Sequence, residues 1–153
     1  MDIKPGPEEL QIIAYKMAMT ELGLKELEGP RANEKILEAF SFTSNKATSD
    51  EVPWCSAMMN RWICKFGGLT GTNDALARSW LSWGVAIKDP RPADIVIFKR
   101  GDSEITGHVG FVHKIGPLWV QVLGGNQGNS VSLKYFSRLN VLGYRRATSK
   151  ELV

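Results

Sequence analysis

The chain of 153 residues contains only two cysteines, Cys55 and Cys64, and their spacing excludes a structural disulfide. Both fall in one predicted helix, where a spacing of nine positions places them about 13 Å apart along the helix axis. A disulfide needs its two Cα atoms within about 7 Å of each other. We therefore expect two free thiols, with Cys64 in the core.

Histidine is equally scarce, since His108 and His113 are the only two. Two cysteines and two histidines raise the question of a zinc site. Eight residues lie between the cysteines and four between the histidines, which does not match the ligand spacing of a zinc finger. We expect no metal site.

The sequence also lacks long apolar runs and a strong charge excess. No run approaches the ~20 residues of a membrane span, and residues 1–9 hold prolines and acids in place of an apolar signal core. The net charge is only +3, and no basic patch is interleaved with aromatic residues, so we expect no nucleic-acid partner. We expect one domain over residues 1–153, a monomer that is made in the cytoplasm without stable membrane insertion.

What the sequence does contain is a cysteine at a predicted helix start. Pro53 suits the first helical position, because its φ is fixed and its missing N–H needs no partner there. Cys55 then lies in the first turn, where free N–H groups and the helix dipole favour the thiolate. The alternative is an unreactive buried cysteine. Trp54, Met58 and Trp62 form the apolar stripe of this helix.

Both histidines lie in an alternating stretch, residues 107–113, which predicts a strand. Residues five apart in a strand point to opposite faces, so at most one histidine can meet Cys55. Nearby glycines leave room around His108, and it opens the strand beside a polar loop. His108 is the better candidate, and His113 is interpreted as a solvated residue at the strand end.

Another predicted strand, residues 118–123, runs into a glycine-rich polar segment at residues 124–129. Such a segment can present an amide that fixes the orientation of an imidazole. Asn126 is the candidate for this role. An ordinary turn residue is the alternative.

The remaining pattern predicts helices first and strands afterwards, which is the order of an α+β domain. Helices are expected from Pro7 to Gly23, from the Asn33 cap to Phe40, and from Thr72 to Gly84. The buried stripe of the first helix is predicted to be Leu10, Ile13, Ala14 and Met17. About five antiparallel strands are expected at 95–98, 109–112, 118–123, 131–133 and 141–144.

Five stretches of the sequence form an ordered set: DEVPWCSA (50–57), ARSWLSWG (77–84), PADIVIF (92–98), GHVGF (107–111) and LGGNQ (123–127). Together they resemble the CHAP family, the cysteine, histidine-dependent amidohydrolases and peptidases that cut bacterial cell walls. The similarity covers roughly residues 8–147 and is greatest to the short, single-domain branch of bacteriophage and prophage genomes.

This resemblance implies a papain-like fold, with the nucleophile at a helix start and the histidine on an antiparallel sheet. It assigns Cys55 as the nucleophile, His108 as the general base and Asn126 as the residue that orients the imidazole. Many relatives have a glutamate near this third position, whereas glycines precede Asn126 here. Gln127 is therefore a competitor for the orienting role.

The implied activity is an endolysin-like peptidoglycan hydrolase that cleaves an amide bond without a metal or organic cofactor. The bond is either the one between muramic acid and L-alanine or one inside the stem peptide. The calcium-binding loop of some relatives has no counterpart in residues 44–49, which predicts calcium independence. Residues expected in the substrate cleft are Trp54, Asp50, Glu51 and Gln127; the alternative for the two acids is that they only complement the helix dipole.

Two alternative functions remain open from the sequence. The same chemistry would serve a bacterial effector or toxin that attacks a rival's wall. A non-enzymatic wall-binding or virion module is the other, although the presence of both Cys55 and His108 argues against it. For the lysin, we expect release to the wall after synthesis in the cytoplasm.

Overall fold

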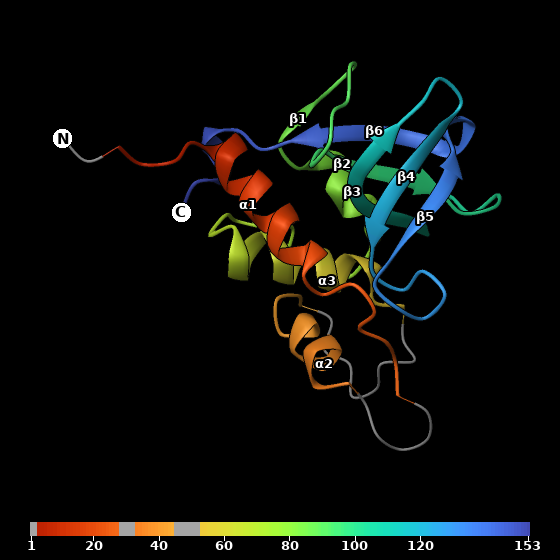
Figure 1. The fold of residues 1–153 in the computed structure, drawn as a ribbon, viewed down its shortest axis with the longest axis horizontal. Helices are drawn as coiled ribbons and strands as arrows, with labels where there is room; N and C mark the ends of the chain where they lie inside the picture. The colour runs from red at the N-terminus through yellow and green to blue at the C-terminus, as the bar shows by residue number, and fades with distance from the viewer. Residues whose placement is uncertain (1–2, 28–32, 45–52) are drawn as a thin grey trace.

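The computed structural model describes residues 3–27, 33–44 and 53–153, in which helices pack against one side of an antiparallel sheet (Figure 1). The α-helices are α1 (Pro7–Met19), α2 (Glu34–Phe40) and α3 (Cys55–Arg61). A π-helical turn, Trp62–Phe66, continues α3, and a 3-10 helix follows at Ala77–Ser82. None of the helices in these ranges has the length and apolar character that crossing a membrane requires.

The sheet has six antiparallel strands in the order β1-β6-β2-β3-β4-β5. The five predicted strands are confirmed, and the α+β class with them. The edge strand β1 was missed, because two residues are too short to show an alternating pattern. The strands are β1 (Val85–Ala86), β2 (Ile95–Lys99), β3 (Gly107–Ile115), β4 (Trp119–Gly124), β5 (Ser132–Ser137) and β6 (Val141–Arg146).

The nucleophile helix α3 lies in the centre of the core, between the sheet and the other helices. All seven of its residues are buried. Trp62, which follows it, stacks on Phe111 of β3 with ring centroids 5.9 Å apart. The predicted stripe of Trp54, Met58 and Trp62 is confirmed as core, with each side chain fully buried.

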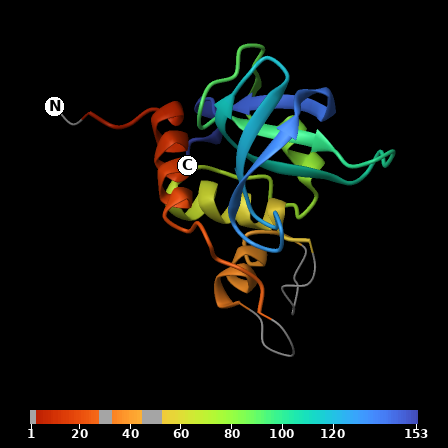
Figure 2. The same cartoon turned by 45° about the vertical axis from the view of Figure 1, so that its right-hand side comes forward.

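The buried face of α1 differs from the prediction. Ile13 and Met17 are exposed, and Gln11 is buried in their place. The Gln11 side chain donates to the carbonyl of Ala93 at 2.8 Å and accepts from the N–H of Ala147 at 2.7 Å. These two bonds turn the polar side chain inward and tie α1 to the sheet and to the C-terminal segment, which lies beside α1 in both views (Figures 1 and 2).

The helix predicted to start at Thr72 is reduced to the 3-10 helix Ala77–Ser82. The backbone N–H groups of Thr72 and Asn73 donate to the buried side-chain oxygen of Asn60, at 2.8 and 3.1 Å. That tertiary contact holds the segment as a loop. Trp80 and Trp83 are core residues, with ring centroids 5.2 Å apart.

A buried ion pair joins α3 to the segment after α1. The guanidinium of Arg61 lies 2.6 Å from Glu21 and 2.8 Å from Glu38 of α2. Glu21 also accepts from the indole N–H of Trp62 at 2.7 Å. Two parts of the chain thereby hold α3 from the side opposite the sheet.

Candidate active site

Cys55 is the first residue of α3, and its side chain is buried. Pro53 was predicted at the first helical position, but the helix begins two residues later. The reason is Trp54, whose backbone is not helical (φ −124°, ψ 14°) and whose indole N–H donates to Glu26 at 2.7 Å. The cysteine is therefore at the helix start itself, where its backbone N–H has no intrahelical partner.

His108 lies near the start of β3, and its ring stacks with two phenylalanine rings that also stack on each other. The ring stacks on Phe98 of β2 and Phe136 of β5, with centroids 6.3 and 5.3 Å away. Only 4% of the residue is exposed. The aromatic neighbours leave the imidazole little freedom to rotate, so its two nitrogens keep fixed directions.

The amide of Gln127 determines which nitrogen of the His108 ring carries the proton. Its nitrogen donates to the carbonyl of Ser132 at 2.8 Å and to that of Val122 at 3.2 Å. The amide oxygen is thereby directed at Nε2 of His108, 2.8 Å away. An amide oxygen only accepts, so Nε2 carries the proton, and Nδ1 of the neutral ring is the basic nitrogen.

The thiol of Cys55 is the group that Nδ1 serves. Nδ1 is buried and has no protein hydrogen-bond acceptor or donor of its own within the described ranges. Burial alone would raise the pKa of the Cys55 thiol, but its interaction with the nearby His108 imidazole outweighs burial. The backbone N–H of Val109 and the charge of Arg100 act in the same direction, so the thiol pKa is lowered overall.

The role predicted for Asn126 is wrong in this structure, because its neighbour Gln127 contacts the histidine. Asn126 has a left-handed backbone (φ 58°). That turn places the next side chain, Gln127, into the space beside Gly124. A Cβ at Gly124 would lie 2.4 Å from the Gln127 amide oxygen, so this position has no room for a side chain.

The other sequence candidates separate into three groups. Trp54 is fully buried and is therefore no surface of a substrate cleft, which corrects that prediction. Asp50 and Glu51 lie outside the described residues. His113 is not simply solvated, because its ring bonds the hydroxyl of Tyr15.

Four residues near the site were missed in the sequence: Glu26, Phe98, Arg100 and Phe136. Phe98 ends a predicted strand, which marks it as core but not as a neighbour of His108, and Phe136 lies beyond the predicted strand at 131–133. Glu26 and Arg100 carry no local sequence signal, since only tertiary folding brings them to Cys55 and Trp54.

No group of three or more His, Cys, Asp or Glu side chains that would suit a metal ion occurs within residues 3–27, 33–44 and 53–153. The predicted absence of a cofactor stays a prediction.

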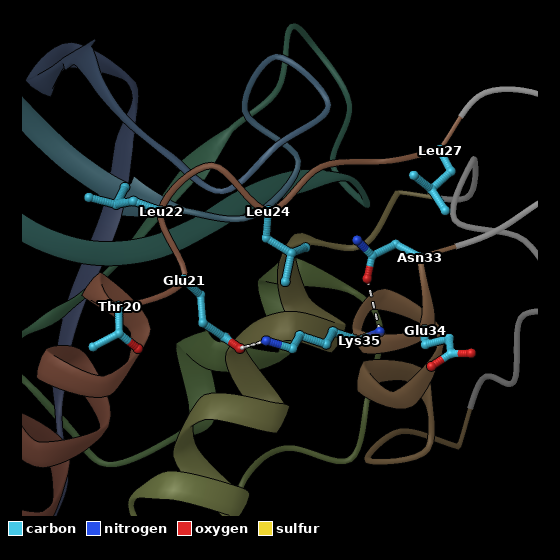
Figure 3. Close-up of a pocket in the computed structure, with 8 residues that line it drawn as sticks. All are labelled: Thr20, Glu21, Leu22, Leu24, Leu27, Asn33, Glu34 and Lys35. Carbon is cyan, nitrogen blue, oxygen red and sulfur yellow. Dashed lines mark hydrogen bonds and ion pairs between the residues drawn. The ribbon is translucent and has the colours of Figure 1, made fainter.

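A hollow of about 790 Å³ lies away from the catalytic pair, between the segment after α1 and the start of α2 (Figure 3). Lys35 extends across it toward Glu21, with the two charged groups 3.7 Å apart. Its lining residues are Thr20, Glu21, Leu22, Leu24, Leu27, Asn33, Glu34 and Lys35.

Comparison with solved structures supports the fold. The protein is similar to NlpC1 from Trichomonas vaginalis (TM-score 0.53, 21% identity, 94% of this chain and 46% of that one). It is also similar to NlpC2 from the same organism (TM-score 0.52, 20% identity, 94% and 48%). A third similar structure is an NLP/P60 family protein, similar to lipoprotein, from Staphylococcus aureus (TM-score 0.50, 14% identity, 97% and 45%). The chain spans about half the length of these proteins, and the shared fold is papain-like.

The sequence itself matches one family model. No curated protein matches the sequence. The model of the CHAP domain matches residues 47–126, which is more than half of the chain and contains Cys55, His108 and Asn126. The chain thus belongs to the CHAP family, the cysteine, histidine-dependent amidohydrolases and peptidases.

Proposed function

We propose that this protein cleaves an amide bond of bacterial peptidoglycan by acyl transfer through Cys55. The observation that carries the proposal is the pairing of a thiol of lowered pKa with an imidazole whose other nitrogen is held by Gln127. A nucleophile, a base and a group that orients the base are what such a reaction needs.

In the proposed reaction, Nδ1 of His108 takes the proton of the Cys55 thiol, and the sulfur attacks the amide carbonyl carbon. The backbone N–H of Cys55 helps to stabilise the negative oxygen that forms. The C–N bond then breaks, and His108 gives its proton to the leaving amine. Water, deprotonated by His108, hydrolyses the resulting thioester and regenerates the thiol.

The test is digestion of purified peptidoglycan by the parent protein and by Cys55→Ala, with products identified by mass spectrometry. We expect only the parent to release fragments. Free stem peptides identify an N-acetylmuramoyl-L-alanine amidase, and cut cross-links or shortened stems identify an endopeptidase. Equal release by both proteins, or no release by folded parent from walls of several species, contradicts the proposal.

We further propose an endolysin-like role, in which the protein is made in the cytoplasm and reaches the wall after release. The resemblance to the phage and prophage branch and the mildly positive charge, which favours an anionic wall, support it. Expression in bacteria with and without a separate pore-forming protein tests this role. Lysis that needs the pore agrees with it, and lysis of neighbouring cells that is blocked by an immunity protein favours the effector role.

A further inference from the structure

The segment after α1 is hydrogen-bonded to the loop that carries Gln127. The N–H of Gly23 donates to the carbonyl of Val131 at 2.9 Å, and the N–H of Val131 donates to Leu24 at 2.7 Å. Three positions after Gly23, the N–H of Glu26 donates to the carbonyl of Asn129 at 3.0 Å. Residues 23–26 therefore form a short two-stranded contact with residues 129–131, which begin two positions after Gln127.

The side chain of Glu26 reaches the other half of the site. Its carboxylate accepts the indole N–H of Trp54 at 2.7 Å, and Trp54 is the residue before Cys55. The indole also packs against the loop that carries Gln127. A Cβ added at Gly125 of that loop would lie only 2.7 Å from the Trp54 ring. Trp54 thus fills the space between the start of α3 and the loop.

Glu26 is consequently linked to both halves of the catalytic pair, by its backbone on one side and by its carboxylate on the other. Its backbone binds the loop that positions Gln127 and, through it, His108. Its carboxylate binds the residue that precedes the nucleophile. The hydrogen bond to Trp54 is partly buried, which makes a charge-assisted contact of this kind stronger than a surface one.

We propose that Glu26 is a positioning residue, which holds Cys55 and the His108–Gln127 pair at their working separation through its bond to Trp54. The inference rests on the proposed cysteine chemistry. It adds to it a carboxylate that touches neither substrate nor the reacting atoms. When the bond is lost, the thiol stays buried but loses part of its contact with the imidazole, so its pKa rises.

The test measures the alkylation rate of Cys55 with iodoacetamide as a function of pH in the full chain. Peptide mass spectrometry resolves Cys55 from Cys64, and Cys64 serves as the reference within each molecule. Four variants are compared with the parent: Glu26→Ala, Glu26→Gln, Trp54→Phe and, as a remote control, Glu8→Ala. Glu8 forms an exposed ion pair with Arg91, away from the site.

We expect Glu26→Ala and Trp54→Phe to move the pH midpoint for Cys55 upward and to slow its alkylation at pH 7 by about tenfold, which corresponds to about one pKa unit. Glu26→Gln keeps an acceptor oxygen and should stay within about threefold of the parent. A fifth protein that combines Glu26→Ala with Trp54→Phe should be no worse than either single change, because both remove the same bond. The profile of Cys64 should not move in any variant.

Three outcomes contradict the proposal. An unchanged Cys55 profile in Glu26→Ala shows that the bond positions nothing. Parallel changes at Cys55 and Cys64, together with a lower Tm, show a merely structural role. If Glu26→Ala does not fold, a parent-like profile in Trp54→Phe has the same meaning. The proposed function fails separately, when Cys55 of the parent itself titrates like an ordinary thiol.

Discussion

Oε1 of Gln127 lies 2.8 Å from Nε2 of His108, and this contact decides which nitrogen of the ring is basic. The amide nitrogen of Gln127 is engaged by two backbone carbonyls, so the amide cannot turn over without losing both bonds. The proton of the neutral ring therefore stays on Nε2, and Nδ1 serves Cys55.

Removal of this amide should impair the base more than any change at the neighbouring position. We expect Gln127→Ala to lower kcat by at least about tenfold, because a poorly oriented imidazole loses part of the contribution of general base catalysis. The matched control is Asn126→Gly, which keeps the left-handed backbone. It should leave the pH profile of Cys55 alkylation as in the parent. A larger shift of that profile in Asn126→Gly than in Gln127→Ala would restore Asn126 to the orienting role.

The two thiols should differ in their pH dependence. Hydrogen bonding to His108 lowers the pKa of Cys55 against the effect of burial, whereas burial raises the pKa of Cys64. As pH falls below the ordinary thiol value of about 8.5, Cys64 should therefore lose reactivity first. Iodoacetamide labelling at pH 6 to 9 measures this. Faster labelling of Cys64 than of Cys55 at pH 7 would contradict it.

Arg61 should be a stability residue. Arg61→Leu leaves the buried carboxylate of Glu21 without its main counter-ion, which we expect to cost about 3 kcal/mol and to lower Tm by about 6–12 °C. The control is Arg91→Leu, which breaks an exposed pair with Glu8 and should change stability by less than about 0.5 kcal/mol. Chemical denaturation measures the free energy of unfolding of both variants. Equal decreases would show that the buried ion pair stabilises the fold no more than the exposed one.

Activity should be independent of calcium. The acidic loop of some relatives is replaced by residues with lysine and serine side chains at 44–49, most of which lie outside the described residues. We expect full peptidoglycan digestion in excess chelator. A loss that added calcium reverses would show that a metal site exists in this chain.

Much of the fold follows from local sequence patterns. The helix caps, the alternation of the strands and the core tryptophans are local features, and they predicted α2, five strands and the helix that carries Cys55. The failures have tertiary causes. Gln11 is buried because two backbone groups of other segments need its amide, and Asn60 holds residues 72–73 outside the predicted helix.

The sequence predicts Cys55 and His108 as the reacting residues, but it does not predict the side chains that support them. Cys55 and His108 stand in recognisable local patterns. The orienting role falls to Gln127 because its amide nitrogen reaches the carbonyls of Val122 and Ser132. These carbonyls need a donor, which an amide supplies and a carboxylate does not. Glu26 binds Trp54 across 28 positions of the chain, and a single sequence contains no trace of that contact.

The central claim is that Cys55 is the nucleophile of a peptidoglycan hydrolase. Its most direct test is a titration of the parent protein with substoichiometric iodoacetamide near pH 6.5. The label on each cysteine and the residual peptidoglycan digestion are measured on the same samples. Digestion should fall in proportion to label on Cys55 and reach zero at one label per molecule, with Cys64 still unmodified. Undiminished digestion by protein that is fully labelled at Cys55 would contradict the account.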